Sequence, residues 1–335
     1  VGGSFTNAGG ITVNNVAKWN GSEWSALGVG VNSVIYSIVA QGTDVFAGGS
    51  FTSAGGVSAN RVAKWNGTSW SAMGVGVNNG VNSLAVSGSD VYVGGSFTTA
   101  GGITANRIAK WNGTSWNTVG TGINNGVNNT VSAVTVLNES VYIGGSFTTA
   151  GSISATGIAK WDGSSWSTFG SGVSSVKSIH IRGTVVYVGG SFTTAGGIAA
   201  NNVAFWSDNT WQAIGSGVNA QVNSMVELNG YLYLGGYFNL AGDVVAGSFT
   251  RTRLLQGQAF YINERGCVVA ENAQPGDTGV IDGVTYEAVD RTLLIQRISE
   301  GADLTKVSVS LVTSMNELFK NNTTFNQAIG NWDVS

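Results

Sequence analysis

The stretch GGSFTTAGG, residues 94–102, contains two glycine pairs separated by five residues. Closely spaced glycines can form a phosphate-binding loop, which leads into the N-terminus of a helix. Here the first pair recurs six times, beginning at Gly2, Gly48, Gly94, Gly144, Gly189 and Gly235, in steps of 46, 46, 50, 45 and 46 residues. No helical pattern follows any copy, so we expect the glycines to be structural parts of a repeat.

A second feature recurs in phase with the glycines. Tryptophans five residues apart form the pairs Trp19/Trp24, Trp65/Trp70, Trp111/Trp116, Trp161/Trp166 and Trp206/Trp211. A fixed period of this length is typical of propellers and other repeat architectures. The residues that define the repeat most clearly are Gly48, Gly49, Gly94, Gly95, Gly144, Gly145, Gly189 and Gly190, together with the three central tryptophan pairs.

One unit shows what the repeat encodes. VNSLAVSGS (81–89) has the alternation of a strand, and DVYVGG (90–95) and RIAKW (107–111) predict a second and a third. Asn112-Gly113 supplies a turn, and SWNTV (115–119) predicts a fourth strand. Four short antiparallel strands in about 45 residues predict one blade of a β-propeller.

The order of these features resembles the repeats of kelch-type and galactose-oxidase-type propellers. The text GGSFTTAGGITANRIAKWNGTSWNTVG is similar to repeats of fungal cortical cell-polarity markers and of large secreted bacterial proteins. The resemblance covers about residues 1–255 and implies an extracellular propeller used mostly for binding. It does not extend to copper oxidase chemistry, because His180 is the only histidine and Cys267, the only cysteine, lies outside the repeats.

The sequence predicts three regions. Residues 1–255 form an all-β propeller of about six four-stranded blades, the first incomplete, and SFTRTRLL (248–255) gives a degraded third strand in the last. Residues 256–310 form a small α+β connector with two hairpins and a helix that Asp290 caps and Gly301 ends. VTSMNELF and TFNQAIGNWDVS, within residues 311–335, resemble the start of a BspA-like leucine-rich surface repeat. We therefore expect the chain to be a fragment of a longer polypeptide.

Composition excludes several functions. Only 10% of residues are charged and the net charge is −3, against about 25% charged in an average protein. Residues 1–255 carry 8 acidic and 10 basic residues, and residues 256–335 carry 10 and 5. This charge does not attract nucleic acid, and no run of 18 apolar residues predicts membrane insertion. A single cysteine and a single histidine give no metal site, and we expect no cofactor.

Few side chains could support catalysis. His180 takes the strand position of Val39, Ala85, Thr135 and Val226, and Glu227 takes that of Ala40, Val86, Val136 and Ile181. Both are either tolerated strand residues or side chains that face the propeller channel. Lys18, Lys64, Lys110 and Lys160 also recur, either as an anion-binding ring or as stems that cover the blade edges. The tryptophans either fill the core or stack on sugars.

The best candidate contact surface is the loop face. The step of 50 residues contains a four-residue insertion near INNGVNNTVS (123–132), which makes Asn124, Asn125, Asn128 and Asn129 the binding candidates. We expect a non-catalytic, extracellular or cell-surface protein that binds glycans or surface proteins in adhesion or surface architecture. The alternative is a carbohydrate-active hydrolase or lyase that uses Glu227.

Overall fold

The computed structural model describes residues 1–120, 125–242, 244–253, 259–262, 268–271, 276, 278–281, 284–309 and 312. The chain divides into two compact units. The first comprises Val1–Arg182 and Val186–Arg253, and the second comprises Leu254–Ser335 with Gly183–Val185. All repeats lie in the first unit.

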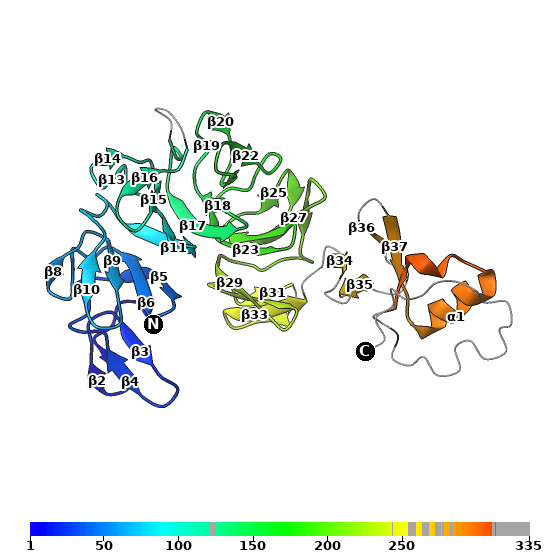
Figure 1. Cartoon of the computed structure of the whole chain (residues 1–335), viewed down its shortest axis with the longest axis horizontal. Helices are drawn as coiled ribbons and strands as arrows, with labels where there is room; N and C mark the ends of the chain where they lie inside the picture. Colours follow the sequence, from blue (N-terminus) through cyan, green and yellow to red (C-terminus); the bar gives the residue numbers. More distant parts are fainter. Residues whose placement is uncertain are drawn as a thin grey trace. The chain divides into compact units, whose positions relative to one another are not determined.

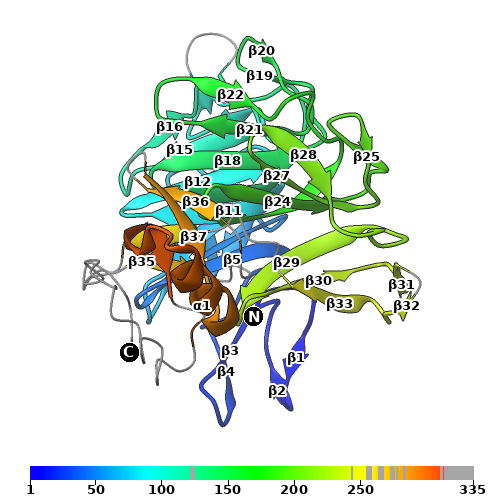
Figure 2. The ribbon, with the colours of Figure 1, turned by 90° about the vertical axis from the view of Figure 1, so that its right-hand side faces the viewer.

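The first unit consists of five blades that follow one another in chain order (Figure 1). Blade 1 contains β5 (Ile35–Gln41), β6 (Asp44–Gly49), β9 (Val62–Trp65) and β10 (Trp70–Ala72); blade 2 contains β11 (Val81–Ser87), β12 (Asp90–Gly95), β15 (Ile108–Trp111) and β16 (Trp116–Thr118). Blade 3 contains β17 (Val131–Leu137), β18 (Ser140–Gly145), β21 (Ile158–Trp161) and β22 (Trp166–Thr168); blade 4 contains β23 (Val176–Arg182), β24 (Val185–Gly190), β27 (Val203–Ser207) and β28 (Thr210–Ala213). Blade 5 contains β29 (Val222–Leu228), β30 (Tyr231–Gly236) and β33 (Phe249–Arg253), which lie side by side in Figure 2.

The number of blades corrects the expectation of six. The structure has five blades, of which the first four have four strands and the fifth has three described strands. The copy that begins at Gly2 gives only a two-stranded hairpin, β3 (Ala17–Trp19) with β4 (Trp24–Ala26), and a single bridge from Gly2 to Val16. Six glycine pairs therefore overestimate the blades by one, because the first copy has no innermost strand.

Each of the five blades, and the incomplete first copy, also carries a small hairpin that the sequence did not predict. The loop before the third strand folds back on itself through two-residue strands: β1 (Asn7–Ala8) with β2 (Ile11–Thr12), β7 (Ser53–Ala54) with β8 (Val57–Ser58), β13 (Thr99–Ala100) with β14 (Ile103–Thr104), β19 (Thr149–Ala150) with β20 (Ile153–Ser154), β25 (Thr194–Ala195) with β26 (Ile198–Ala199), and β31 (Leu240–Ala241) with β32 (Val244–Val245). The first glycine at each tip adopts positive φ, which glycine tolerates best. These loop hairpins form the wall of the grooves described below.

The core lies between neighbouring blades. Phe46 and Val62 of blade 1 belong to the same buried cluster as Val81, Leu84 and Val93 of blade 2. The innermost strands β5, β11, β17, β23 and β29 each contact the next in chain order. At Gly94, an added Cβ would lie 2.5 Å from Val134 Cγ2 of blade 3. The first glycine is therefore required because the neighbouring blade approaches its backbone. The second, Gly95, is required because the Gly80 carbonyl oxygen of its own blade would lie 2.1 Å from an added Cβ.

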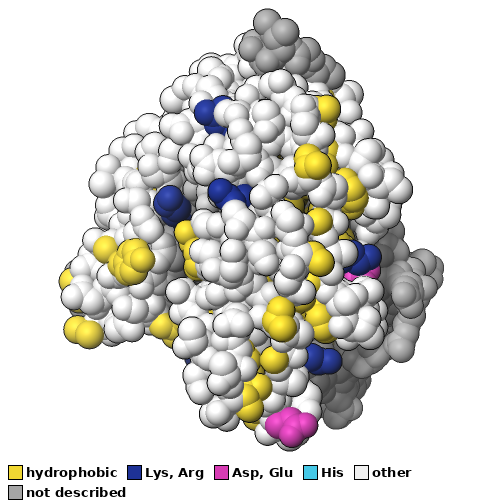
Figure 3. All heavy atoms as spheres, turned by 90° about the vertical axis from the view of Figure 1, so that its left-hand side faces the viewer, with side chains coloured by type: hydrophobic (Ala, Val, Ile, Leu, Met, Phe, Trp, Pro, Cys, Tyr) yellow, Lys and Arg dark blue, Asp and Glu magenta, His cyan; other side chains and the backbone are white. Residues whose placement is uncertain are grey.

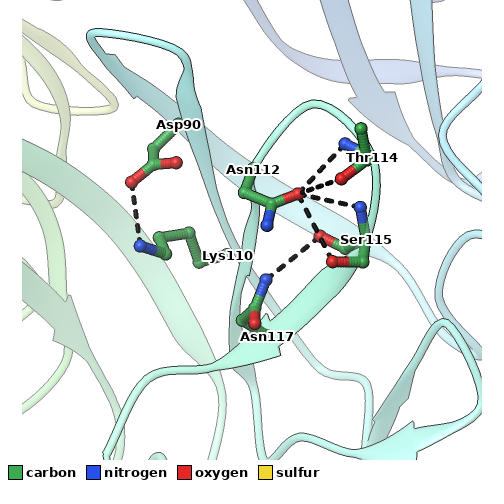
Figure 4. Close-up of polar contacts among 6 residues, drawn as sticks. All are labelled: Asp90, Lys110, Asn112, Thr114, Ser115 and Asn117. Carbon is green, nitrogen blue, oxygen red and sulfur yellow. Dashed lines mark hydrogen bonds and ion pairs between the residues drawn. The ribbon is translucent and has the colours of Figure 1, made fainter.

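The tryptophan pair closes each four-stranded blade. Trp111 and Trp116 lie opposite each other on β15 and β16, with ring centroids 5.4 Å apart. The buried Trp116 indole donates a hydrogen bond from Nε1 to the Met73 carbonyl of the preceding blade at 2.8 Å. The turn between the two strands is held by Asn112 Oδ1, which accepts bonds from the backbone N–H groups of Thr114 and Ser115 (Figure 4). The tryptophan thus links two blades as well as two strands.

The second unit has the α+β composition that the sequence predicts. It contains β34 (Ala259–Ile262) paired with β35 (Val268–Glu271), and β36 (Thr278–Ile281), β37 (Val284–Ala288) and β38 (Val307–Ser308) in a second sheet. The helix α1 (Arg291–Glu300) and the short 3₁₀ helix η1 (Leu304–Lys306) connect β37 to β38. As predicted, Asp290 caps α1 by accepting a bond from the Leu293 N–H at 2.8 Å, and Gly301 ends it in a left-handed conformation.

Candidate binding site

The loop face of the propeller carries a repeated clamp. Asn128 Oδ1 accepts bonds from the backbone N–H groups of Thr148 and Thr149, and its Nδ2 donates to Thr148 Oγ1 at 2.8 Å. Asn32, Asn78 and Asn219 make the corresponding contacts in three other copies of the repeat. Asn128, one of the predicted binding residues, therefore uses its amide to fix a loop hairpin in the same way as its counterparts.

Two arginines occupy an unusual backbone position beside this clamp. Arg61 and Arg107 have φ angles of 68° and 64°, in the left-handed region that costs most L-residues roughly 1–2 kcal/mol. The repeat imposes this geometry: the Arg107 N–H donates to the Phe97 carbonyl, and its own carbonyl accepts from the Gly95 N–H, both at 2.9 Å. The same position holds Asn15, Gly157, Asn202 and Ser248 in the other copies, and asparagine and glycine adopt it more readily than arginine or serine.

Each arginine lines a groove on the loop face. The Arg107 groove has a volume of about 210 Å³ and is formed by Asn106, Arg107, Asn125, Gly126, Val127, Asn128, Thr149 and Gly151. The Arg61 groove has about 400 Å³ and is formed by Asn60, Arg61, Val75, Gly76, Val77, Asn78, Thr99 and Gly102. The two grooves therefore present the same groups on successive blades: a guanidinium, asparagine amides and a threonine.

The two guanidinium groups differ in their contacts. Arg61 Nη1 donates to the Phe51 carbonyl at 3.3 Å. The side chain of Arg107 is half-buried and makes no hydrogen bond or ion pair within the described part of the chain. Among the described residues, no carboxylate lines either groove. Both grooves are therefore locally positive although the whole chain has a net charge of −3.

The insertion loop enters the Arg107 groove through Asn125. Its Nδ2 donates to the Thr104 carbonyl at 3.0 Å, and its Oδ1 accepts from Asn106 Nδ2 at 3.3 Å. In the Arg61 groove, Asn60 is the counterpart of Asn106, and its Nδ2 donates instead to the Val75 main-chain carbonyl. Asn129 is exposed, and its Oδ1 accepts from the Thr130 N–H. Asn124, also predicted to bind, lies outside the described residues.

The two channel candidates meet on neighbouring innermost strands. His180 on β23 lies with Nε2 2.9 Å from Glu227 Oε2 on β29, and Arg182 Nη1 lies 3.4 Å from Glu227 Oε1. All three side chains are about one quarter exposed. Burial raises the pKa of the adjacent Tyr187 to about 12, an effect that Arg182 opposes and Glu227 reinforces. Sequence reasoning singled out both residues but not their contact, which depends on the register between two blades.

The contact replaces an apolar one. Val39 and Val86, at the equivalent positions of blades 1 and 2, pack against one shared hydrophobic cluster, and Ala85 and Val136 do so between blades 2 and 3. The pair His180 and Glu227 therefore joins blades 4 and 5 at positions where aliphatic side chains join blades 1 and 2 and blades 2 and 3. Within the described residues, no group of three or more histidines, cysteines and carboxylates could hold a metal ion.

Two of the four recurring lysines form ion pairs with carboxylates. Lys110 Nζ lies 2.8 Å from Asp90 Oδ2 (Figure 4), and Lys64 pairs with Asp44 at 2.7 Å. Lys160 lies over the Tyr142 ring, with Nζ 5.5 Å from its centroid. Figure 3 shows a face on which charged side chains are few and scattered. The two groove arginines differ from Lys64 and Lys110, since no carboxylate lines their grooves within the described part of the chain.

Comparisons with known proteins match parts of the chain. A model of the family described as Mycoplasma proteins of unknown function (DUF285) matches residues 292–335. No curated protein matches the chain. None of the described helices is both long and apolar enough to cross a membrane.

Solved structures that resemble the chain share little sequence with it. The computationally designed Ika8 protein is 14% identical, with a TM-score of 0.44, and the match covers 78% of this chain and 70% of Ika8. The extracellular domain of BT4673 from B. thetaiotaomicron is 14% identical (TM-score 0.40; 65% of this chain, 34% of that one), and the GH74 enzyme of Niastella koreensis is 18% identical (TM-score 0.42; 66% and 37%). The chain thus spans about a third of the length of the BT4673 domain and of the GH74 enzyme. At these TM-scores, the assignment of a propeller rests on the strand order of the blades.

Proposed function

We propose that this protein is a non-catalytic binding module that holds an anionic glycan, with carboxylate or sulfate groups, on the loop face of its propeller. The observation that carries the proposal is the pair of arginines in left-handed backbone positions. Asparagine or glycine would fill these positions at lower cost, as they do in three of the four other copies. Strained residues are enriched at functional sites, so an arginine retained there points to a role for its guanidinium.

The groups in each groove suit such a ligand. A guanidinium binds a carboxylate or sulfate through two parallel hydrogen bonds, and amides and hydroxyls bind sugar hydroxyls. Repetition of the grooves on blades 1 and 2 matches a polymer whose charge also repeats. Occupying both grooves with one chain would raise the apparent affinity well above that of one groove.

An extracellular or cell-surface location supports the same proposal. It rests on the resemblance of the blades to kelch-type and fungal cell-polarity repeats, and of residues 311–335 to BspA-like surface repeats. In that setting, adhesion to glycans or the organisation of surface polymers is the role we propose.

A glycan array probed with the full chain tests the proposal. We expect reproducible binding to uronate- or sulfate-bearing glycans and weaker binding as ionic strength rises. The double variant Arg61→Asn/Arg107→Asn should lose at least tenfold in affinity without loss of stability, because asparagine tolerates the left-handed conformation better. Lys18→Asn is the matched control, since it removes one positive charge from an exposed side chain outside the grooves. Unchanged affinity in the double variant would refute the proposal.

The pair His180 and Glu227 supports a second candidate, a carbohydrate-active enzyme. A partly exposed carboxylate hydrogen-bonded to a histidine could transfer a proton. If the protein hydrolyses any glycan that it binds, Glu227→Gln should abolish turnover while affinity is retained. We favour the non-catalytic proposal because the pair occupies the position of an apolar contact between blades.

A further inference from the structure

The two arginine grooves differ at one equivalent position of the wall. Val75 in the Arg61 groove and Asn125 in the Arg107 groove each stand directly before a glycine that lines the groove. Val75 is 66% exposed, so it presents an aliphatic surface to solvent. Asn125 is half-buried, and its Oδ1 accepts a hydrogen bond from Asn106 Nδ2 at 3.3 Å. The wall at this position is therefore apolar in one groove and polar in the other.

A hydrogen-bond acceptor lies beside the exposed valine. Asn60 Nδ2 donates to the Val75 carbonyl at 3.0 Å, which fixes the side-chain amide next to the aliphatic residue. No described residue donates to Asn60 Oδ1, so this oxygen can accept a bond from a ligand N–H. Arg61 Nη1 donates to the Phe51 carbonyl, and the other N–H groups of this guanidinium have no partner within the described part of the chain. The groove therefore combines a cation, an acceptor and an apolar surface.

An N-acetylated acidic sugar carries the complementary groups. The N–H of an acetamido substituent can donate to Asn60 Oδ1 while the methyl group of the same substituent packs against Val75. The carboxylate of the sugar can pair with the Arg61 guanidinium through charge-assisted hydrogen bonds. The volume of the groove, about 400 Å³, lies within the roughly 300–1,000 Å³ that is typical of small-molecule sites. A hydroxyl in place of the acetamido group would leave the aliphatic surface of Val75 in water.

We propose that the Arg61 groove selects acidic sugars that bear an N-acyl group, with Asn60 and Val75 as the residues that determine this specificity. The inference rests on the proposed glycan site and adds the chemical class of sugar that one of its grooves recognises. The Arg107 groove has a guanidinium but a polar wall at the position of Val75, so it contributes affinity for charge and does not distinguish acylated from unacylated sugars.

The chain contains the same amide and valine without the arginine. Before blade 1, Asn14 Nδ2 donates to the Val29 carbonyl at 2.8 Å, and Val29 is 63% exposed. Asn15 stands where the Arg61 groove has its arginine, and its Nδ2 donates to the Val31 carbonyl. This copy lacks the cation, so we expect it not to hold an acidic sugar. Val29→Asn is therefore the matched control for Val75→Asn.

Two matched probes test the proposal. They are polyacrylamide conjugates of N-acetylneuraminic acid and of its analogue with a hydroxyl in place of the acetamido group. The full chain with Arg107→Asn is used, so that only the Arg61 groove supplies a guanidinium, and affinities are measured by surface plasmon resonance. We expect the acetamido conjugate to bind about tenfold more tightly than the hydroxyl conjugate. Adding Val75→Asn should lower this ratio about fourfold, because the acetyl methyl group loses its apolar contact, whereas adding Val29→Asn should leave the ratio unchanged.

Equal affinity for the two conjugates would overturn the proposal, as would a ratio that survives Val75→Asn or that falls equally with Val29→Asn. If Val75→Asn lowers the melting temperature, Val75→Ser replaces it, since serine holds this position before blades 4 and 5 as Ser171 and Ser216. The same comparison of ratios then decides.

Adding Arg61→Asn separates this inference from the glycan site on which it rests. If both conjugates bind equally and Arg61→Asn removes both, the glycan site stands and the acyl preference fails. Binding of neither conjugate, together with arginine-dependent binding of other acidic glycans on the array, also refutes the acyl preference alone. If acidic glycans bind equally well with and without the two arginines, the proposed function itself fails.

Discussion

The packing between blades predicts that two chemically identical substitutions will have opposite effects. Gly94 and Gly235 are equivalent glycines on the second strands of blades 2 and 5. An alanine Cβ at position 94 would lie 2.5 Å from Val134 Cγ2 and 2.6 Å from Val131 Cγ1. At position 235 it would meet no heavy atom of the described residues within 4 Å. The pair therefore isolates the contribution of the neighbouring blade.

The magnitude follows from these distances. Ordinary contacts of a Cβ begin at 3.4 Å, so both valine methyl groups would have to retreat by about 0.8–0.9 Å. Both lie on β17, the innermost strand of blade 3, which is also held by β11 and β18. Overpacking of a tight core costs about 1–3 kcal/mol, and we expect Gly94→Ala to lie at the upper end of that range. Gly235→Ala should change stability by less than 0.5 kcal/mol, or stabilise slightly by restricting the unfolded chain, as is typical at roughly 0.4–1 kcal/mol.

Denaturant unfolding followed by circular dichroism provides the assay. The midpoint of Gly94→Ala should fall with an unchanged slope, and that of Gly235→Ala should remain at the wild-type value or rise. Equal losses of stability in both variants would show that the cost arises from the backbone of the glycine strand. The approach of the next blade would then not be the reason why the first position of the pair is glycine.

Three further predictions concern single side chains. Trp116→Phe should cost about 1–3 kcal/mol more than Trp166→Phe. The first change leaves the Met73 carbonyl without its indole donor, whereas Trp166 Nε1 is buried with no partner among the described residues; equal midpoints in denaturant would contradict this. Hydrogen bonds from the N–H and hydroxyl groups of two serines that follow it lower the pKa of Asp162. The stability that these bonds contribute is therefore present above the unfolded pKa of 3.8 and is lost as the pH falls. Asp162→Asn should retain more of its stability than wild type at pH 3, and parallel pH profiles of the two proteins would refute the assignment. Burial raises the pKa of Tyr187 from 10.0 to about 12, so the folded protein should lose stability as the pH rises from 10 to 12, while Tyr187→Phe should show a flatter profile in the same titration.

Much of the fold could be predicted because its main constraints are local. The alternation in residues 81–89, the Asn-Gly turn after Trp111 and the tryptophan spacing together indicate four strands, and blade 2 forms all of them. The helix α1 was predicted from its capping residues, and the structure confirms both caps. The number of blades could not be read in the same way, because a glycine pair indicates a second strand and says nothing of whether the first and fourth are present.

The candidate site was less predictable because its geometry depends on pairs of repeats. His180 and Glu227 stand one position apart in the repeat, and only the contact between β23 and β29 brings their side chains together. The sequence did contain a feature that marks the arginine grooves, since Arg61 and Arg107 stand where three of the four other copies have asparagine or glycine. The two arginines were not predicted as site residues because the residue type at a position does not by itself reveal a left-handed backbone.

The glycan site proposed here departs from the repeat in a way that the geometry of the repeat does not require. Glycines and tryptophans recur because a blade needs them, so they carry information about packing and little about ligands. Arg61 and Arg107 occur where asparagine would be more stable, and packing between blades does not recover that cost. Binding of an anionic ligand from outside the propeller would recover it, which is why we place the glycan at these two arginines.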